Sequence, residues 1–513
     1  MFRLVKTVMF TFESIYTKKV GGLAEVPPRL ASVLIEIGVD AELYLPNHGY
    51  IDTCSDPDYA VWMENNLYCI KKLEGVKPPH YLVGGGVLDD PVVYSPQSLV
   101  LKTLVFARVL REYFSEKLRG FTERLVFHGH DWHSIPTLLS LNSLLFDRGL
   151  SAPLILHFHL ATKNRIELAD LCRHAGLCEN TVIHGDHGAR EFKYYYDAGG
   201  GILERIAGYT IDKVLTVSRG FSKTIARYTG LHAVGKVDYV FNASPFNWGY
   251  VVEVVSSRGV KTPEDPLERA RFRRTLLTNL IGGIEVSFLD VESKRRVSDI
   301  LNHYSVVYNR VFSDDGPLVF STGRLSRQKG FDYVLRALDK LTLINPRIKL
   351  ILSIIPLGYQ NDLLIDWIEA VLSYPENLRV LPGVLSRENT VLLYYASNAV
   401  LIPSRSEPFG LVALESMASG TPVVAARTGG LVDIVVDIER DPLNGVGLLF
   451  DVGNVDELAE ATGRLIELVE PKGGNVEGAR RLRMNCIKRA GEFSWRASAE
   501  KTKSIYREFI DLT

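Results

Sequence analysis

Two carboxylates frame a glycine in residues 404–430, where Glu407 and Glu415 lie on either side of Gly410. Gly410 and Leu411 open an apolar run, so we expect a helix to begin there. The unpaired N–H groups and the positive dipole end of such a helix favour a diphosphate. Eight helical residues span about 12 Å, so the glutamates can contact the two ends of an extended nucleotide-sugar but cannot share one hydroxyl. Taken alone, the pair is also typical of one first-turn acid and one exposed surface acid.

Two cations lie about eighty residues upstream. In "STGRLSRQKGF" a strand is followed by Arg324 and Lys329, with glycines at 323 and 330. Fixed cations stabilise the charge that a diphosphate gains as it leaves a sugar carbon, so they act where catalysis is electrostatic. The alternative is ordinary solvated surface charge.

A third candidate motif, "KKVGGLAEV", follows the first predicted strand. It contains Lys19, and the adjacent Gly21 and Gly22 let the backbone approach a ligand closely. The spacing is not the GxGxxG of dinucleotide-binding proteins, which disfavours a nicotinamide enzyme. An ordinary turn is the alternative for this glycine pair.

Eight of the twelve histidines lie between positions 128 and 187. Asp131 in "HGHDWHS" follows one predicted strand, and His159 in "LHFHLATKN" ends the next. Both therefore face the same edge of a parallel sheet, where His159 can hydrogen-bond a sugar hydroxyl. A structural histidine in the core or on the surface is the alternative.

A metal site is the competing hypothesis for the segment "CRHAGLCENTVIHGDH". Its spacing matches no standard zinc signature, so we predict no metal there or elsewhere. The segment contains Cys172, His174, Cys178, His184 and His187.

The five cysteines are scattered and odd in number, which fits a reducing compartment better than a disulfide framework. They are Cys54, Cys69, Cys172, Cys178 and Cys486. The N-terminal apolar run leads into Glu13 without a small-residue cleavage site, so we interpret it as a strand and expect a cytoplasmic protein.

Composition excludes several classes of protein. Hydrophobic residues make up 46% and charged residues 23% of the 513 positions, as in soluble globular proteins, and no apolar run is long enough to span a membrane. Lys+Arg total 59 and Asp+Glu total 60, so there is no long-range field to gather nucleic acid or an anionic membrane. The sequence leaves the oligomeric state open.

Short β-rich runs alternate with helical patterns twice along the chain, which predicts an α/β protein with two doubly wound, Rossmann-like domains facing across a cleft. We expect an N-terminal domain over residues 1–243 and a charged linker with helices over 244–315. A nucleotide-sugar-binding domain is expected over 316–490, and a terminal helix over 491–513 that packs back on the N-terminal domain.

Together these motifs resemble the glycogen synthases among the retaining GT-B glycosyltransferases, the bacterial and archaeal starch synthase type. The resemblance covers most of the chain, and "LPNHGY" and "YLVGGGVLDD" are similar to archaeal members. Its other carriers are "KVGGLAEV", "HGHDWHS", His159, "TVSRG", "GRLSRQKG", the E-x7-E element and "RTGGLVDIV".

The resemblance implies glucose transfer from ADP-glucose or UDP-glucose to the non-reducing 4-hydroxyl of an α-1,4-glucan, without a cofactor or an essential metal. Glu407 would face the glucose and Glu415 the ribose. The implied catalytic residues are Asp131, His159, Arg324, Lys329 and Glu407. The implied donor-binding residues are Lys19, Gly21, Gly22, Gly323, Gly410, Leu411, Glu415, Thr428 and Gly429.

Some segments depart from the family pattern. Ala243 replaces the glycine that usually follows Asn242, and residues 164–196 and 250–315 match poorly, so the hinge and the acceptor can differ. One alternative keeps the fold but makes a trehalose- or sucrose-type product or glycosylates a lipid. Others are a catalytically silent glucan-binding protein and a phosphorylase with pyridoxal phosphate.

Overall fold

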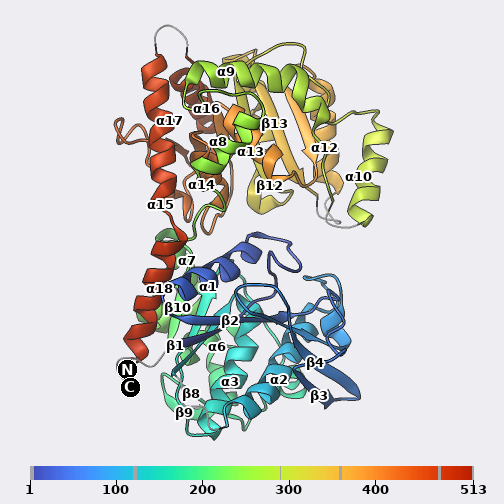
Figure 1. Cartoon of the computed structure of the whole chain (residues 1–513), viewed down its shortest axis with the longest axis vertical. Helices are drawn as coiled ribbons and strands as arrows, with labels where there is room; N and C mark the ends of the chain where they lie inside the picture. The colour runs from blue at the N-terminus through green and yellow to red at the C-terminus, as the bar shows by residue number, and fades with distance from the viewer. Residues whose placement is uncertain (1–4, 120–123, 289–290, 357–360, 472–474, 511–513) are drawn as a thin grey trace. The chain divides into compact units, whose positions relative to one another are not determined.

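The computed structural model describes residues 5–119, 124–288, 291–356, 361–471 and 475–510. The chain divides into two units (Figure 1). The first unit contains Met1–Asn242 and Ser494–Thr513, and the second contains Ala243–Phe493. Each unit is built on its own, largely parallel sheet, so the predicted α/β class with two doubly wound sheets is confirmed.

The first unit contains a nine-stranded sheet in the order β11-β10-β7-β6-β1-β2-β5-β4-β3. From β1 the chain builds outward through β2 and then returns to place β6 on the other side of β1. The loops after β1 and β6 therefore leave at the point where the strand order reverses, which is where open α/β sheets bind ligands. The parallel strands are β1 (Val5–Phe10), β2 (Asp40–Pro46), β5 (His80–Gly84), β6 (Arg124–His130), β7 (Leu154–Phe158), β10 (Lys213–Thr216) and β11 (Val237–Tyr239).

An antiparallel edge, absent from the sequence prediction, completes this sheet. Strands β3 (Tyr59–Met63) and β4 (Asn66–Lys72) form a hairpin, and β4 also pairs antiparallel with β5. β3 alternates half-buried and exposed residues as an edge strand does, so it lacks the continuous apolar run used to recognise the central strands. A separate hairpin joins β8 (Val182–Gly185) to β9 (Gly188–Glu191).

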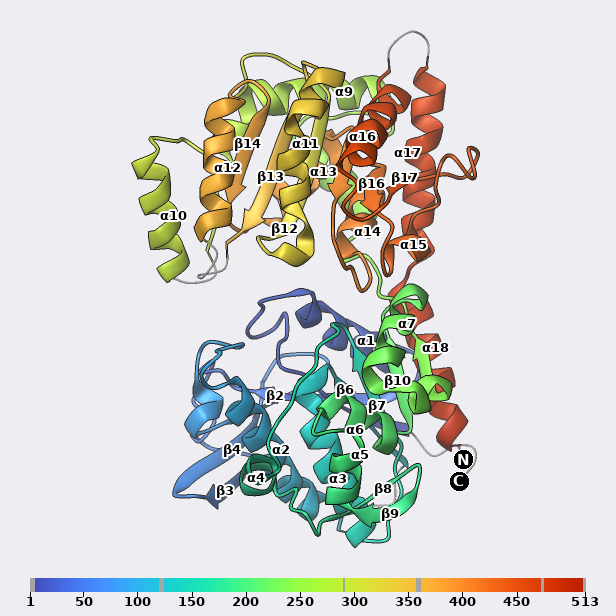
Figure 2. The same cartoon turned by 180° about the vertical axis from the view of Figure 1, so that it is seen from behind.

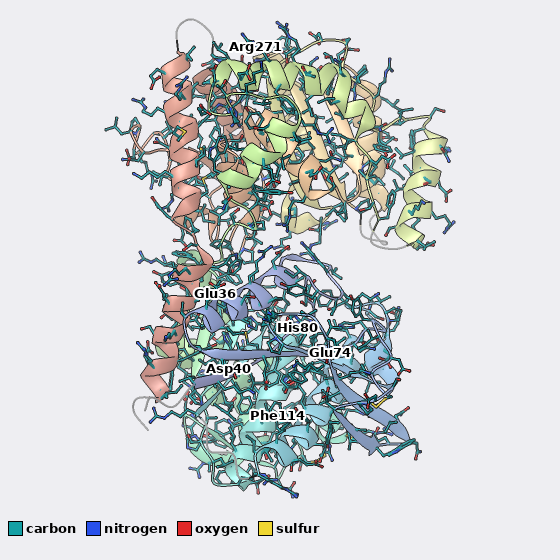
Figure 3. All side chains as sticks on the ribbon, viewed as in Figure 1. Glu36, Asp40, Glu74, His80, Phe114 and Arg271 are labelled. Carbon is teal, nitrogen blue, oxygen red and sulfur yellow. A yellow bond between two sulfur atoms is a disulfide. The ribbon has the colours of Figure 1, made fainter. Side chains whose placement is uncertain are left out.

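Helices cover both faces of this sheet. One face packs against α1 (Val26–Glu36) and α18 (Trp495–Ile510) around a core that includes Leu30, Ile155 and Tyr506. On the other face, Phe114, labelled in Figure 3, packs edge-on against Phe10. The remaining helices are α2 (Leu99–Lys117), α3 (Ile135–Asp147), α4 (Leu168–Asp170), α5 (Phe192–Ala198), α6 (Leu203–Thr210) and α7 (Arg219–Thr229).

The second unit contains a six-stranded, all-parallel sheet in the order β14-β13-β12-β15-β16-β17. Here the order reverses between β12 and β15, so the loops after these two strands leave side by side. The strands are β12 (Leu318–Arg324), β13 (Lys349–Ile355), β14 (Leu378–Pro382), β15 (Ala399–Ile402), β16 (Val423–Ala426) and β17 (Gly447–Phe450).

Figure 2 shows α11 (Phe331–Ile344), α12 (Asn361–Ser373) and α16 (Val455–Val469) on one face of this sheet, where they share its main apolar core. Along the chain, α16 is followed by α17 (Val476–Gly491). The others are α8 (Trp248–Ser257), α9 (Pro266–Thr275), α10 (Val291–His303), α13 (Arg387–Ala396), α14 (Leu411–Ala418) and α15 (Leu431–Ile434).

Residues 244–315 are not a separate linker, because they lie within the second unit. The sequence predicted a linker here because the segment is rich in charged residues. Arg269 of α9 is buried and donates to the carbonyl oxygens of Ser419 and Tyr395 and to the hydroxyl of Thr421. A buried guanidinium that donates three hydrogen bonds is compatible with a core, although the Arg269 Nε has no partner among the described residues. A charge-rich segment therefore forms part of the domain here.

The prediction of free, scattered cysteines is wrong for four of the five. Cys54 is bonded to Cys69, and Cys172 to Cys178, whereas Cys486 is a buried free thiol. The first disulfide ties the β4 strand to the loop before β3, a closeness that exists only once the hairpin has formed. Within the described residues, no helix is long and apolar enough to cross a membrane.

Candidate functional site

In the second unit, the loops after β12 and β15 are joined by an ion pair. The Lys329 ammonium donates to Glu407 Oε2 over 2.7 Å, and the Ser404 hydroxyl donates to the same oxygen over 3.2 Å. Lys329 belongs to a short 3-10 helix, η8 (Arg327–Lys329), and Glu407 is almost fully buried. Two residues predicted from separate motifs are thus brought together where the strand order reverses.

Arg405, which the sequence motifs did not indicate, braces these loops. Arg405 forms a two-pronged ion pair with Asp332, both contacts 2.6 Å long, and donates to the carbonyl of Arg327 over 2.7 Å. Its guanidinium also lies 4.1 Å from the centre of the Tyr333 ring. Such bidentate, stacked geometry is specific to arginine. The signal in the sequence is an arginine directly before the Glu407 motif, but its partner lies on another element.

Arg324 stands at the end of β12, half-buried. Among the described residues, the Arg324 guanidinium has no hydrogen-bond or ion-pair partner, in contrast to the side chains of Lys329 and Arg405. A cation held on a strand end without a carboxylate partner retains its donors for an external anion. Gly330, just beyond, has φ +69°, and a Cβ there would lie 2.0 Å from the Pro403 carbonyl, so only glycine permits this approach of the two loops.

The predicted helix start is confirmed, because α14 begins at Leu411 with Gly410 as its N-cap. Glu415 lies inside α14 and accepts a hydrogen bond from the Tyr394 hydroxyl over 2.8 Å. Burial and the Glu415 charge hold the Tyr394 pKa well above its usual value, so this hydroxyl keeps its proton and stays a donor. Glu415 is therefore oriented from within the domain, whereas Glu407 is oriented by Lys329.

A third loop, after β16, joins the same group. The Gly430 amide donates to the Glu407 carbonyl over 2.9 Å, and the Thr428 hydroxyl donates to the Arg405 carbonyl over 3.3 Å. At Gly429 a Cβ would approach the Glu407 carbonyl to 1.9 Å, and φ is +50°. Thr428 and Gly429 therefore lie directly against the Glu407 loop.

In the first unit, the glycine motif is organised by a residue that the sequence analysis did not single out. Glu13 accepts from the amides of Val20 and Gly21 over 2.7 and 2.8 Å and from the Tyr94 hydroxyl over 2.7 Å. The Gly21 amide is thus occupied by Glu13. Gly22 opens the short helix η1 (Gly22–Glu25).

Lys19 is about half exposed and pairs with Glu25 over 2.7 Å. Arg29 contacts the other oxygen of Glu25 over 2.6 Å, and these two cations, although burial opposes them, keep the Glu25 pKa below its usual value. Because Arg29 also neutralises Glu25, Lys19 can move to another anion without leaving that carboxylate unpaired.

Asp131 follows β6 with φ +61°, a left-handed conformation that non-glycine residues rarely adopt. Its Oδ1 accepts from the backbone amides of His159 and Leu160 over 2.6 and 3.0 Å. Burial raises the Asp131 pKa to about 7, against the effect of those two amides. A buried, strained acid at the end of a central strand is typical of a functional site.

His159 comes directly after β7 and is half-buried. Its Nε2 shares a hydrogen bond of 3.0 Å with His130 Nδ1. Burial and neighbouring histidines hold the pKa of both rings well below the usual value, so both are neutral. The first unit thus brings Asp131 and His159 together, as the sequence predicted from adjacent strand ends.

The competing metal segment does not assemble. Cys172 and Cys178 form a disulfide and have no thiolate to offer. Among the described residues, only His128, His130 and His157 cluster as metal ligands would, and these belong to β6 and β7.

Two family models match the chain. The starch synthase catalytic domain matches residues 6–236, and the model named glycosyl transferases group 1 matches residues 309–489. The first match covers the sheet of its unit except β11, and the second covers the whole sheet of its unit. Both include the predicted site residues of their units.

Individual proteins agree with these matches. An uncharacterized glycosyltransferase of Methanocaldococcus jannaschii is 32% identical over 204 residues, which is 39% of this chain and 47% of that protein. Several such relatives match over less than half of their length. Glycogen synthase of Thermus caldophilus is 25% identical over 513 residues, covering 99% of this chain and 100% of that protein.

One solved structure is similar over the full length. The catalytic domain of starch synthase IV from Arabidopsis thaliana, bound to ADP and acarbose, has a TM-score of 0.71 at 19% identity and covers 99% of both chains. At this level of identity the similarity demonstrates a shared fold.

Proposed function

The chain belongs to the glycosyltransferases of the glycogen synthase and starch synthase type, with the GT-B fold, and on this premise we propose its reaction. It transfers glucose from ADP-glucose or UDP-glucose, with retention of configuration, to the non-reducing 4-hydroxyl of an α-1,4-glucan. The reaction needs no cofactor. We place it in the cytoplasm, although its two disulfides are commoner in oxidising compartments.

The observation that carries the proposal is the Lys329–Glu407 pair at the reversal of strand order in the second unit. A diphosphate bound there meets the Lys329 ammonium and the unpartnered Arg324 guanidinium. As the bond from the sugar to the diphosphate breaks, negative charge builds up on the diphosphate, and these fixed cations stabilise it. Glu407, which is paired with the same lysine, accepts a hydrogen bond from a glucose hydroxyl.

The remaining groups of the second unit fit the rest of the donor. The start of α14 at Gly410 and Leu411 offers backbone amides to the phosphates. Glu415, oriented by Tyr394, accepts hydrogen bonds from the ribose hydroxyls. Gly323, Thr428 and Gly429 supply close backbone approach in the flanking loops.

The first unit is assigned to the transferred glucose. His159 is a neutral imidazole with its Nε2 engaged by His130, so its Nδ1 is the ring nitrogen left to hydrogen-bond a sugar hydroxyl. Asp131 holds the His159 backbone and fixes where the ring lies. Lys19, Gly21 and Gly22 approach the diphosphate, with Glu13 holding the shape of their loop.

Labelled donors test the proposal directly. Purified protein is incubated with glucose-labelled ADP-glucose or UDP-glucose and with either glycogen or free glucose. We expect the label to appear in glycogen and to be released from it by amylases. The Glu407→Gln variant should lose this transfer. Label found only in a disaccharide, or no nucleoside diphosphate released from either donor, contradicts the proposed reaction.

A further inference from the structure

Four histidines line one face of the first unit's sheet. His128 and His130 alternate along β6, and His157 and His159 follow the same alternation on and just beyond β7. The register places His130 directly opposite His157, and the two strands run side by side in Figure 2. The same face carries Thr7 of β1 and is covered by α18 through Tyr506. His128, His130 and His157 are at most 1% exposed.

In His128 and in His130, one ring nitrogen makes a hydrogen bond and the other makes none with a described residue. His128 Nδ1 bonds the Tyr506 hydroxyl over 2.7 Å, and that hydroxyl lies 3.2 Å from Thr7 Oγ1. His130 Nδ1 bonds His159 Nε2 over 3.0 Å. In both rings the partnered atom is Nδ1, and within the described part of the chain Nε2 has no partner.

The third ring adds further unsatisfied nitrogen. Neither nitrogen of His157 makes a hydrogen bond of standard geometry with a described residue, although the Thr216 backbone lies beside the ring. Buried polar atoms are nearly always satisfied, and each exception calls for an occupant such as an ion or a water molecule. Three buried imidazoles with ring nitrogens unpartnered by any described residue form, in the tautomer that leaves those nitrogens bare, the donor set that zinc and its neighbours in the first transition series prefer.

We propose that His128 Nε2, His130 Nε2 and a ring nitrogen of His157 bind one late first-row divalent metal ion, such as Zn²⁺. The potential ligand atoms of these three residues already lie within 4.8 Å of one another. Two ligands alternate on one strand, and the third lies opposite on the next, so the sheet itself fixes their Cα positions. The ion binds inside the first unit, on the face that α18 covers.

The neighbouring contacts serve such a site. Ligating histidines usually donate their other ring N–H to an acceptor, which fixes the tautomer and leaves the second nitrogen bare. Tyr506 and His159 stand at those positions for His128 and His130. In the tautomer in which His130 Nδ1 donates to His159 Nε2, a metal on His130 polarises that N–H. The site is then linked to His159, to which the proposed function assigns the sugar.

Binding requires the rings to turn. They now stack nearly parallel, with the centres of His128 and His130 4.5 Å apart at 21° and those of His130 and His157 5.5 Å apart at 29°. Parallel rings direct their lone pairs alongside one another, so each must rotate about its Cβ–Cγ bond to face a shared ion. The proposal requires the backbone to stay in place and the Nδ1 contacts with Tyr506 and His159 to be remade after that rotation.

Metal binding to the whole, tag-free protein tests the proposal. Protein stripped with a chelator is titrated with Zn²⁺ and with Co²⁺, and bound metal is measured by mass spectrometry after gel filtration. We expect one equivalent per chain and, with Co²⁺, the visible absorption of nitrogen-ligated cobalt. A chain that retains less than a tenth of an equivalent of either ion overturns the proposal, whatever the variants do.

Matched variants locate the ion. His157→Phe keeps a flat ring in the stack, and His130→Gln is a milder change in case the first variant fails to fold. Each is expected to lower metal affinity at least tenfold. The control is His187→Gln, on the exposed β8–β9 turn outside the cluster. Binding that survives both cluster variants but falls in the control also overturns the proposal.

Discussion

The Lys329 ammonium lies 2.7 Å from Glu407 Oε2, across 78 positions of sequence. The two side chains are 19% and 10% exposed, so the pair is only partly screened by water. The ammonium holds the carboxylate and lies where the order of the strands reverses. In the free enzyme Lys329 neutralises Glu407, and in the proposed complex it is shared with the donor diphosphate.

Lys329→Ala is expected to lower kcat/KM by about 100-fold or more, the scale set by removing one preorganised transition-state contact. It also leaves Glu407 buried without its cation. The measurement is the initial rate of transfer from labelled nucleotide-glucose to glycogen. The control is Lys340→Ala, which removes the exposed pairs with Asp456 and Glu460 and should leave the rate unchanged. Equal rates in the two variants contradict the assigned role.

Arg405→Lys tests the brace between the loops. Lysine retains the charge but cannot form the two-pronged contact with Asp332 or stack on Tyr333 in the same way. Because the pair is about one third exposed, the loss of stability is expected to be only about 1 kcal/mol. The larger effect should be a raised KM for the nucleotide-sugar, because the Glu407 loop is no longer held. An unchanged KM shows that the brace does not position the site.

The pH dependence of stability has a defined source in His48. Burial and the nearby Lys102 lower the His48 pKa from 6.5 to about 4, while its Nε2 bonds the Phe12 carbonyl over 2.8 Å. The unfolded chain therefore binds a proton more readily, and stability falls as pH drops from about 6.5 to about 4. The contribution is on the order of 3 kcal/mol.

His48→Asn tests this, since asparagine tolerates the left-handed backbone found at His48. The variant should lose less stability than the parent between pH 7 and pH 4, as measured by urea unfolding at each pH. If stability falls equally in the parent and the variant between pH 7 and pH 4, His48 does not titrate in that range.

The disulfides predict a thiol count. Of five cysteines, four are paired, so the unfolded, unreduced chain should take up one alkyl group, at Cys486, and five after reduction. The Cys54–Cys69 bond closes a loop of 15 residues, so Cys54→Ser should destabilise the first unit by about 3 kcal/mol. Three or five alkylated thiols before reduction contradict the pairing.

The sequence predicts those features of the molecule that depend on residues close together in the chain. The loop that carries Arg324 and Lys329 follows an apolar strand and precedes a helix, and the start of α14 at Gly410 is visible as a glycine before an apolar run. Asp131 and His159 could be predicted to lie together, because neighbouring parallel strands end at the same edge.

The features that the sequence did not predict depend on strand register and on contacts between residues far apart in the chain. The Arg405 brace joins residues 73 positions apart, and the Cys54–Cys69 bond depends on a hairpin whose outer strand has no apolar run. The histidine cluster needs the pairing of His130 with His157, which sets which side chains share a face. Buried arginines such as Arg269 look like surface charge until their partners are known.

The most direct test of the account is a crystal structure of the protein with ADP or UDP. The account predicts the diphosphate within hydrogen-bond distance of Arg324 and Lys329, with the ribose hydroxyls on Glu415. A nucleotide bound elsewhere on the second unit, with these three side chains untouched, contradicts it.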